Sequence, residues 1–288
     1  MLLLNNKKLG GVFMKNFVDC SFIVNFKDPT SLFLIDCRFD LFNESSGYNS
    51  YKESHIPNAF FLDINKDICG SPQLHGGARP LPDNNILKSK LSSFGINQNS
   101  TIVVYDEKLY SSPRAFVQLK YMGYKNVYIL NGGFKAWKDN NLPITNEIPS
   151  LLSPQTFNLS PDTSMICDIH YVRESIKETD IVLVDCRDNS RYTGEIEPLY
   201  KKPGHIPNAI NIPWHNNIDD NGFIKDLNII DRNFSILKNK EIITYCGSCI
   251  EACINYALLD ELSYNAKTYI GSMSDWVSYD ENDVESLF

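Results

Sequence analysis

The pentapeptide His-Ile-Pro-Asn-Ala occurs at residues 55–59 and returns, letter for letter, at residues 205–209. Each copy follows an apolar run that ends in Asp-Cys-Arg, at residues 32–38 in the first half and 181–187 in the second. Short apolar runs that end in charged residues are typical of buried strands. The repeat distance of about 150 residues is that of a domain and is too long for a solenoid. The repeat therefore indicates a duplicated domain.

Two further pairs of segments follow in the same order. Residues 242–246, Ile-Ile-Thr-Tyr-Cys, correspond to residues 102–106, Ile-Val-Val-Tyr-Asp. Residues 271–276, which end in Trp, correspond to residues 132–137, which also end in Trp. Four matched landmarks in one order are not a chance similarity, and they support duplication of the whole domain.

In each half, expected strands alternate with expected helices, such as those at 84–94 and 113–122. This order predicts an α/β fold with a mainly parallel central sheet and helices on both faces. We predict two tandem domains, at residues 15–146 and 163–288, joined by a proline-containing linker at 147–162.

The composition is that of a globular protein, with 43% hydrophobic and 22% charged residues. The net charge of −8 argues against nucleic acid or an anionic membrane as the main partner. We find neither an apolar run long enough to cross a membrane nor a secretory signal, since Met1-Leu-Leu-Leu leads at once into Asn5-Asn-Lys-Lys. The eight cysteines then point to a reducing compartment, and we expect a cytoplasmic location.

The sequence Tyr-Cys-Gly-Ser-Cys-Ile-Glu-Ala-Cys, residues 245–253, lies between an expected strand and an expected helix. Cys246 thus falls where unpaired backbone N–H groups and the helix dipole favour a negative charge. A thiol there should ionise below its usual pKa of about 8.5 and act as a nucleophile. The alternative is a buried structural cysteine. The Gly247-Ser248 pair weighs against it because small residues let the backbone approach a ligand.

At these residues the chain resembles the tandem-domain rhodanese family, the thiosulfate/3-mercaptopyruvate sulfurtransferases. The resemblance rests on Asp-Cys-Arg followed by His-Ile-Pro-Asn-Ala in both halves, on Asn-Gly-Gly-Phe-Lys-Ala-Trp at 131–137, and on the loop that begins at Cys246. It implies two rhodanese-like domains with catalysis in the second. The first domain is expected to be inactive, because Asp106 stands at the position of Cys246 and a carboxylate cannot carry sulfur.

The resemblance implies that Cys246 takes the outer sulfur of a small anionic donor, thiosulfate or 3-mercaptopyruvate, as a persulfide. Cyanide or a thiol, such as thioredoxin or a low-molecular-weight thiol, would then accept it. No metal and no organic cofactor is expected. Arg191 matches the family position that binds the donor's anionic group, and Asp185 with Arg187 is expected to brace the loop as an ion pair. The loop residues expected to surround the sulfur are Gly247, Ser248, Cys249, Ile250, Glu251 and Ala252.

The loop departs from the family pattern at Cys249, Ile250 and Glu251, where Gly-Val-Thr is usual. A carboxylate at 251 should raise the pKa of the thiol and repel anions, unless it points outward as a first-turn acid. The second arginine of mercaptopyruvate enzymes is absent, and Lys201 or Lys202 could replace it.

First-half histidines give a weaker signal. His75 lies near the position of a histidine that is proposed to assist catalysis in the mercaptopyruvate enzymes of the family. The acid that pairs with that histidine is replaced by Asn65 here, so we predict no proton relay. His55 and His205 are expected to be structural.

Two other functions fit part of the sequence. Cys246 and Cys249 form a Cys-x-x-Cys pair, so the chain could be a thiol–disulfide redox protein with Cys249 as the resolving thiol. It could also be a degenerate rhodanese module that relays or binds sulfur. A phosphatase is disfavoured because Ala252 stands where an arginine is needed, and cysteines 246, 249 and 253 lack a fourth metal ligand nearby.

Overall fold

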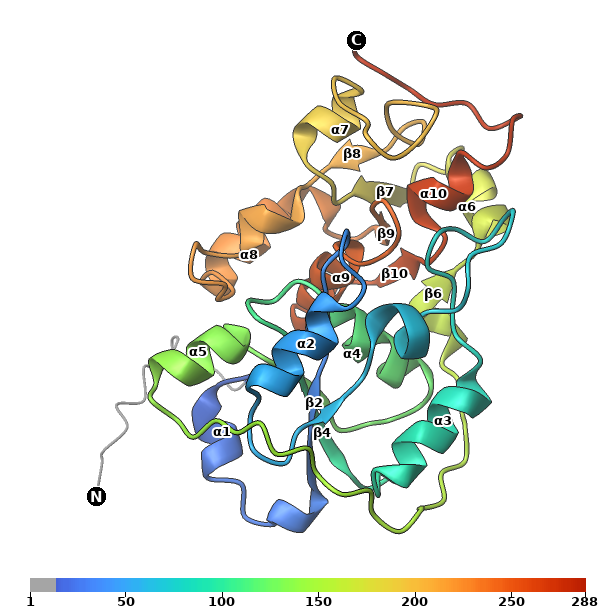
Figure 1. Cartoon of the computed structure of the whole chain (residues 1–288). Coiled ribbons are helices and arrows are strands. Elements are labelled where there is room, and N and C mark those ends of the chain that lie inside the picture. The colour runs from blue at the N-terminus through green and yellow to red at the C-terminus, as the bar shows by residue number, and fades with distance from the viewer. Residues whose placement is uncertain (1–13) are drawn as a thin grey trace.

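The computed structural model describes residues 14–288 and contains two five-stranded parallel sheets, one in each half of the chain (Figure 1). The prediction that no secretory signal precedes the first domain concerns residues 1–13, which lie outside the described residues. The strand orders are β1-β5-β4-β2-β3 and β6-β10-β9-β7-β8, so the two sheets have the same topology. The predicted α/β fold with two parallel sheets is therefore confirmed.

The strand bounds show how closely the halves agree. The first sheet is formed by β1 (Phe17–Val18), β2 (Leu32–Asp36), β3 (Phe60–Phe61), β4 (Thr101–Tyr105) and β5 (Val127–Leu130). The second is formed by β6 (Ile166–Cys167), β7 (Ile181–Asp185), β8 (Ile210–Asn211), β9 (Glu241–Tyr245) and β10 (Ala266–Tyr269). Strands β4 and β9 are central and covered on both faces, which explains their nearly continuous apolar sequences.

Helices cover the sheets on both sides. Those of the first half are α1 (Cys20–Val24), α2 (Ser46–Glu53), α3 (Asn84–Ser93), α4 (Ser112–Tyr121) and α5 (Gly133–Asp139). Those of the second half are α6 (Ile169–Ser175), α7 (Asn189–Thr193), α8 (Leu227–Asn233), α9 (Ala252–Glu261) and α10 (Ser272–Trp276). The helices expected at 84–94 and 113–122 are present within one residue at each end.

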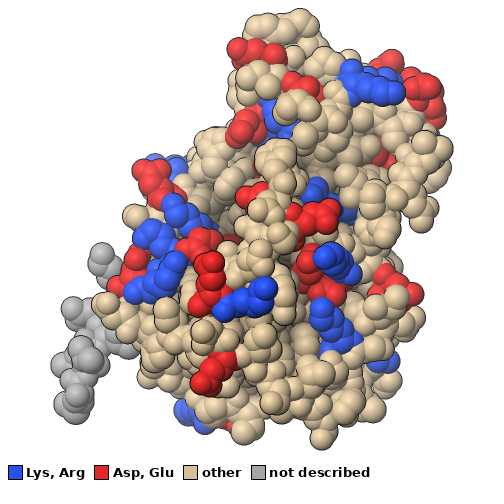
Figure 2. Space-filling view, viewed as in Figure 1, with Lys and Arg blue, Asp and Glu red and all other residues tan. Residues whose placement is uncertain are grey.

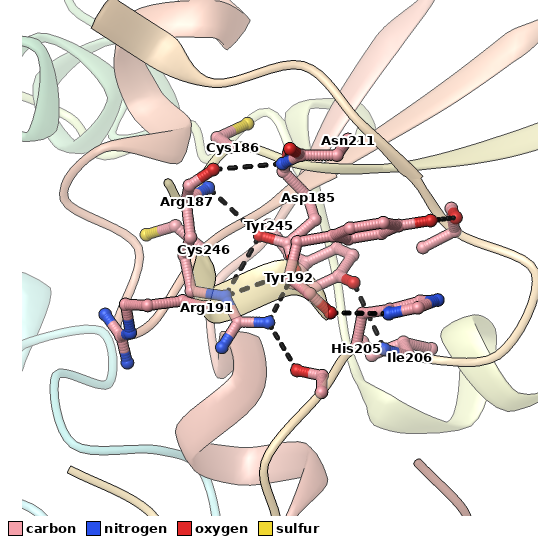
Figure 3. A network of polar contacts seen from close by, with 12 residues as sticks. Asp185, Cys186, Arg187, Arg191, Tyr192, His205, Ile206, Asn211, Tyr245 and Cys246 are labelled. Carbon is pink, nitrogen blue, oxygen red and sulfur yellow. Dashed lines mark hydrogen bonds and ion pairs between the residues drawn. The ribbon is translucent and has the colours of Figure 1, made fainter. Parts of the chain in front are cut away.

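The repeated pentapeptide fastens a loop to the central strand of its sheet. The Ile56 N–H donates to the Tyr105 hydroxyl at 3.2 Å, and the Ile206 N–H donates to the Tyr245 hydroxyl at 3.1 Å (Figure 3). The histidine before each isoleucine bonds through Nδ1 to a backbone carbonyl at 2.7 Å. These contacts agree with the structural role expected for His55 and His205, and they hold the strand end that carries residue 106 or 246.

The two halves pack together through α4 and α9, which lie side by side at the centre of Figure 1. One hydrophobic cluster runs through this contact and includes Leu119 of α4 and Leu258 of α9. Residues 147–162 contain no helix or strand. The domain limits at 146 and 163 stay a proposal, which this irregular segment supports.

The surface mixes charges of both signs. Figure 2 shows Lys and Arg side chains interspersed with Asp and Glu on the face that it presents. An extended basic patch of the kind that nucleic acid favours is not visible on that face. Among the helices of residues 14–288, none has both the length and the apolar character that crossing a bilayer requires.

Candidate active site

Cys246 follows the last residue of β9 and is completely buried. Its backbone N–H donates to the Ser272 hydroxyl at 3.2 Å, and its carbonyl accepts from the Met273 N–H at 3.0 Å. The next carbonyl, that of Gly247, accepts from the Ser274 N–H at 3.0 Å. The start of α10 therefore fixes the first residues of the loop that connects β9 to α9.

The corresponding loop of the first domain shows what this backbone conformation can hold. The Asp106 carboxylate accepts from the backbone N–H groups of residues 108–112, among them Lys108 at 2.9 Å, Tyr110 at 2.7 Å and Ser112 at 2.6 Å. A ring of amides that converges on one anion is an anion nest. In the first domain the nest is filled by the side chain of Asp106, which belongs to the same loop.

The Cys246 loop has the same course. The third residue after Asp106, Leu109, has a φ of 95°, and the third residue after Cys246, Cys249, has a φ of 61°. The helix begins at the sixth residue in both, Ser112 and Ala252. The backbone of the Cys246 loop therefore follows the same course as the loop whose amides hold a carboxylate in the first domain.

The ionisation of Cys246 differs from the sequence-based expectation. Burial raises the pKa of the Cys246 thiol, and the charges of Glu251 and Cys249 raise it further, while the backbone N–H groups of Ala252 and Ser248 oppose them. The expected lowering of this pKa is therefore wrong for the free enzyme. The helix N-terminus acts in the predicted direction, but desolvation of the thiolate outweighs it.

Glu251 is the residue at which the charge of the loop departs from the family pattern. It is partly buried rather than turned outward, and burial raises the pKa of its carboxyl to about 7, against the opposing charge of Arg191. The idea that it serves as an exposed first-turn acid is not supported. A carboxyl with this pKa changes its charge near neutral pH, and with it the ionisation of Cys246.

Arg191, the middle residue of the short helix α7 (Asn189–Thr193), lies beside the loop. A Cβ atom added to Gly247 would stand 3.5 Å from Arg191 Nη1 and 3.0 Å from the Tyr200 hydroxyl. Arg191 Nη2 donates to both Glu197 carboxylate oxygens, at 2.8 and 3.0 Å. Glycine at 247 therefore leaves room for the guanidinium and the phenol, and Glu197 fixes the guanidinium.

Asp185 and Arg187 form the predicted ion pair (Figure 3). Arg187 is fully buried, and its Nη2 lies 2.6 Å from Asp185 Oδ2. Its Nη1 lies 3.0 Å from Glu197 Oε2, so Glu197 joins Arg187 to Arg191. The network therefore joins Asp185 at the end of β7 to Arg191 in α7, and its role as a brace for the loop stays a prediction.

Cys249 is the second cysteine of the loop and is buried. Its sulfur lies 3.7 Å from Cys253 Sγ and 3.3 Å from the Thr268 hydroxyl. The pKa of the Cys249 thiol is lowered, first by the hydrogen bond from Cys253 and also by the buried guanidinium of Arg114. Reaction of Cys249 with Cys246 as a resolving thiol stays a prediction, and the contacts of its sulfur are with other groups.

Lys201 and Lys202 are the two candidates to replace the second arginine, and Lys201 is exposed. Lys202 Nζ donates to the backbone carbonyls of Tyr279, Asp280 and Asn282, so it fixes the C-terminal segment. His75 bonds to the Ser278 hydroxyl at 2.8 Å and stacks on Tyr279.

Sequence reasoning missed an arginine from the first domain. Arg79 Nη1 donates to the Ser248 hydroxyl at 2.8 Å, and Arg79 Nε donates to Asn65 Oδ1 at 3.1 Å. Glu197, Tyr200 and Tyr110 were missed as well. Of these, only Glu197 had a signal, since an acid six residues after Arg191 can pair with it.

Comparison with known proteins gives one consistent result. The family model described as Rhodanese-like domain matches residues 22–140 and 168–279. A probable 3-mercaptopyruvate sulfurtransferase of Pseudomonas aeruginosa is 34% identical over 256 residues, which cover 86% of this chain and 89% of that protein. A thiosulfate sulfurtransferase of the same organism is 28% identical over 243 residues, with 82% and 87% coverage. The crystal structure of SseA from Escherichia coli, which is described as showing the rhodanese fold of 3-mercaptopyruvate sulfotransferases, superposes with a TM-score of 0.77 at 28% identity, covering 90% of this chain and 98% of that one.

Proposed function

Since this chain belongs to the tandem-domain rhodanese family, whose members move sulfane sulfur through a cysteine persulfide, we propose that Cys246 is the residue that carries the sulfur here. The observation that carries this assignment is the loop that follows β9. It has the same course as the loop whose amides surround the Asp106 carboxylate, with a thiol in place of that carboxylate. The same amides would stabilise the negative charge on a thiolate and on the terminal sulfur of a persulfide.

The first step is nucleophilic substitution at sulfur. The Cys246 thiolate forms a bond to the outer sulfur of the donor, and the donor's bond to that sulfur breaks. With thiosulfate the electron pair leaves on sulfite, and with 3-mercaptopyruvate it leaves on the carbon of pyruvate, which takes up a proton. In the second step an acceptor thiolate attacks the terminal sulfur and Cys246 leaves as a thiolate. Such a sequence predicts ping-pong kinetics.

Arg191 is proposed to bind the anionic group of the donor, because its guanidinium stands over Gly247 at the mouth of the loop. The loop amides of residues 247–252 are proposed to surround the sulfur. Asp185 and Arg187 are proposed to support this arrangement, since they bond to each other and Arg187 also bonds to Glu197, which holds Arg191.

We favour 3-mercaptopyruvate over thiosulfate as the donor. Gly247 and Ser248 stand where thiosulfate enzymes of the family carry Arg-Lys, and the 34%-identical relative bears the mercaptopyruvate name. A thiol such as thioredoxin or a low-molecular-weight thiol is the proposed acceptor. The eight free cysteines support a reducing, cytoplasmic setting, and the net charge of −8 disfavours nucleic acid or an anionic membrane as a partner.

Intact-protein mass spectrometry tests the assignment. The reduced protein and the variant Cys246→Ser are exposed briefly to each donor. We expect the wild type, and the matched control Cys249→Ser, to gain one sulfur atom, and Cys246→Ser to gain none. No gain with either donor, together with loss of two hydrogens on mild oxidation that needs both Cys246 and Cys249, would replace this function by thiol–disulfide exchange.

A further inference from the structure

A loop of the first domain, residues 70–82, lies against the start of α10 beside the catalytic loop. The Gly76 N–H donates to Asp275 Oδ1 at 2.7 Å, and the Ala78 N–H donates to the Ser274 hydroxyl at 2.9 Å. Gly77 has a φ of 85°, and a Cβ there would collide with the backbone of Gly271. The loop is therefore fixed on the catalytic domain by its backbone.

Arg79 extends from this loop to the active site. Its guanidinium donates to the Ser248 hydroxyl at 2.8 Å and to the Asn65 amide oxygen at 3.1 Å, and it lies 5.2 Å from the centre of the Phe39 ring. All three neighbours are uncharged. Within residues 14–288, no carboxylate oxygen lies within ion-pair distance of Arg79. Its charge is thus held at the site without a counter-ion, and the side chain keeps partial access to solvent.

The other arginines near the donor site are already neutralised. Arg187 and Arg191 are matched by the carboxylates of Asp185 and Glu197, which contact them at 2.6 to 3.0 Å. Glu251 adds negative charge when it ionises. A donor anion that met only these groups would find a pocket that is neutral or negative, which opposes binding.

A second buried arginine does not change this account. Arg114 is completely buried, and its charge acts on the thiols of Cys69, Cys249 and Cys253 behind the loop. Its charge therefore acts on thiols of the protein itself.

Tyr110 lies near the remaining charged groups. Burial and the charges of Glu251 and Cys246 raise the pKa of its hydroxyl, while Arg79 and Arg191 oppose them. The two guanidinium groups, one from each domain, therefore lie within electrostatic reach of the same hydroxyl as the nucleophile.

We propose that Arg79, from the domain that lacks a nucleophile, is a second donor-binding residue of the active site and sets its preference for anionic donors. This inference rests on Cys246 as the sulfur carrier. With Nε and one Nη1 proton engaged by Asn65 and Ser248, the planar guanidinium is held in place, and its remaining N–H groups suit a carboxylate or sulfonate. Because the Ser248 oxygen accepts from Arg79, its own proton is left to donate to the bound donor.

Steady-state kinetics of Arg79→Gln and Arg79→Lys test the proposal. We expect the donor KM of Arg79→Gln to rise about tenfold or more, the effect of losing one charged hydrogen bond, with kcat much less affected. Arg79→Lys should recover part of the loss because the charge remains. Arg232→Gln is the matched arginine control, since Arg232 is exposed on α8 and its Nε donates to the Asn228 carbonyl of the same helix.

The variant Ser274→Ala distinguishes loss of donor binding from loss of contact between the loop at 70–82 and the catalytic domain. It removes another hydrogen bond between the same loop and the catalytic domain but removes no charge. If Ser274→Ala raised KM as much as Arg79→Gln, or if Arg79→Gln left KM unchanged, Arg79 would not be a donor-binding residue. If Arg79→Gln fails to fold, Arg79→Lys serves as the test. The proposal would then be overturned if the KM of Arg79→Lys for both donors, and the salt dependence of that KM, were the same as in wild type.

The mass of the wild type, measured after exposure to saturating donor, distinguishes a failure of the Cys246 proposal from a failure of the Arg79 proposal. A wild type that gains no sulfur contradicts the function of Cys246 itself. A wild type that gains sulfur while the Arg79 variants keep a normal KM contradicts only the role of Arg79.

Discussion

The guanidinium of Arg191 is clamped by Glu197, with Nη2 at 2.8 and 3.0 Å from the two carboxylate oxygens. Glu197 in turn lies 3.0 Å from Nη1 of Arg187, which is bound to Asp185. Two cations and two carboxylates therefore form one nearly closed network behind the catalytic loop. Arg191 Nη1 lies 3.5 Å from the Cβ position of Gly247, on the side of the loop where we propose that the donor anion binds.

This clamp makes Arg191→Lys an informative substitution. A lysine keeps the charge but cannot bond to Glu197 and to a donor with one planar group. We expect kcat/KM to fall about tenfold or more, by loss of a charged hydrogen bond, mainly through a higher KM. Steady-state kinetics with both donors provides the measurement. Arg173→Lys is the control, since Arg173 pairs with the exposed Glu281 away from the loop. Equal kcat/KM for Arg191→Lys and wild type would remove Arg191 from donor binding.

Glu251→Gln should shift the pH dependence of persulfide formation toward acid. Ionised Glu251 is the second largest cause, after burial, of the raised pKa of Cys246. Without that charge the thiol ionises at lower pH, so the rate rises at neutral pH. Stopped-flow or rapid-quench measurement of sulfur transfer from pH 5 to 10 provides the profile. A loss of rate at every pH would instead indicate that the Glu251 carboxylate accepts the thiol proton.

The same substitution has a separate effect on stability. Burial raises the pKa of Glu251 from 4.5 to about 7, so the folded protein prefers the neutral carboxyl. The stability that the neutral form contributes is complete below pH 4.5 and is lost as pH rises through about 7. Glu251→Gln removes this loss, so its Tm relative to wild type should be higher at pH 8.5 than at pH 5. Thermal melts at the two pH values measure the difference, and a constant or opposite offset would contradict the buried-carboxyl assignment.

Local sequence patterns predicted most of the framework. The paired strands, the Asp185–Arg187 ion pair and the position of Cys246 follow from segments of a few residues that occur twice, so local geometry decides them. The structure repeats that geometry almost exactly in residues 36 and 38, where Arg38 Nη2 lies 2.7 Å from Asp36 Oδ2.

Features set by long-range packing were not predictable in this way. The hydrogen bond from Arg79 to Ser248 joins residues 169 positions apart, and the Gly- and Pro-rich loop around Arg79 has no periodicity to indicate what it contacts. The pKa of Cys246 was predicted in the wrong direction for a related reason. A helix N-terminus is visible in the sequence, whereas complete burial of the thiol and the inward position of Glu251 are properties of the folded chain.

Asp106 is predicted to be essential to the stability of the first domain. Asp106→Ala would leave the N–H groups of residues 108–112 without their shared acceptor in a buried place. An unsatisfied buried group costs about 1–3 kcal/mol, so we expect the variant to lose about 3 kcal/mol or more. Its Tm should fall by about 6 °C or more, and the Tm of Asp106→Asn should lie between those of wild type and Asp106→Ala. The control Asp139→Ala, which breaks a surface pair with Lys135, should change Tm little. An unchanged Tm for Asp106→Ala would show that water replaces the carboxylate in the nest.

Cys249 is predicted to pair with Cys253 rather than with Cys246 when the protein is oxidised. The sulfurs of Cys249 and Cys253 are 3.7 Å apart, and Cys253 Sγ also lies 3.1 Å from the Cys249 carbonyl oxygen. A disulfide needs the two sulfurs to approach to about 2.0 Å, which a small side-chain movement allows for this pair. Peptide mapping after treatment with diamide should therefore find a Cys249–Cys253 bridge, abolished in Cys253→Ser, while Cys249→Ser keeps full persulfide formation on Cys246. A Cys246–Cys249 bridge as the main product, with slower sulfur release in Cys249→Ser, would instead establish Cys249 as a resolving thiol and require the loop to turn its side chain toward the nucleophile.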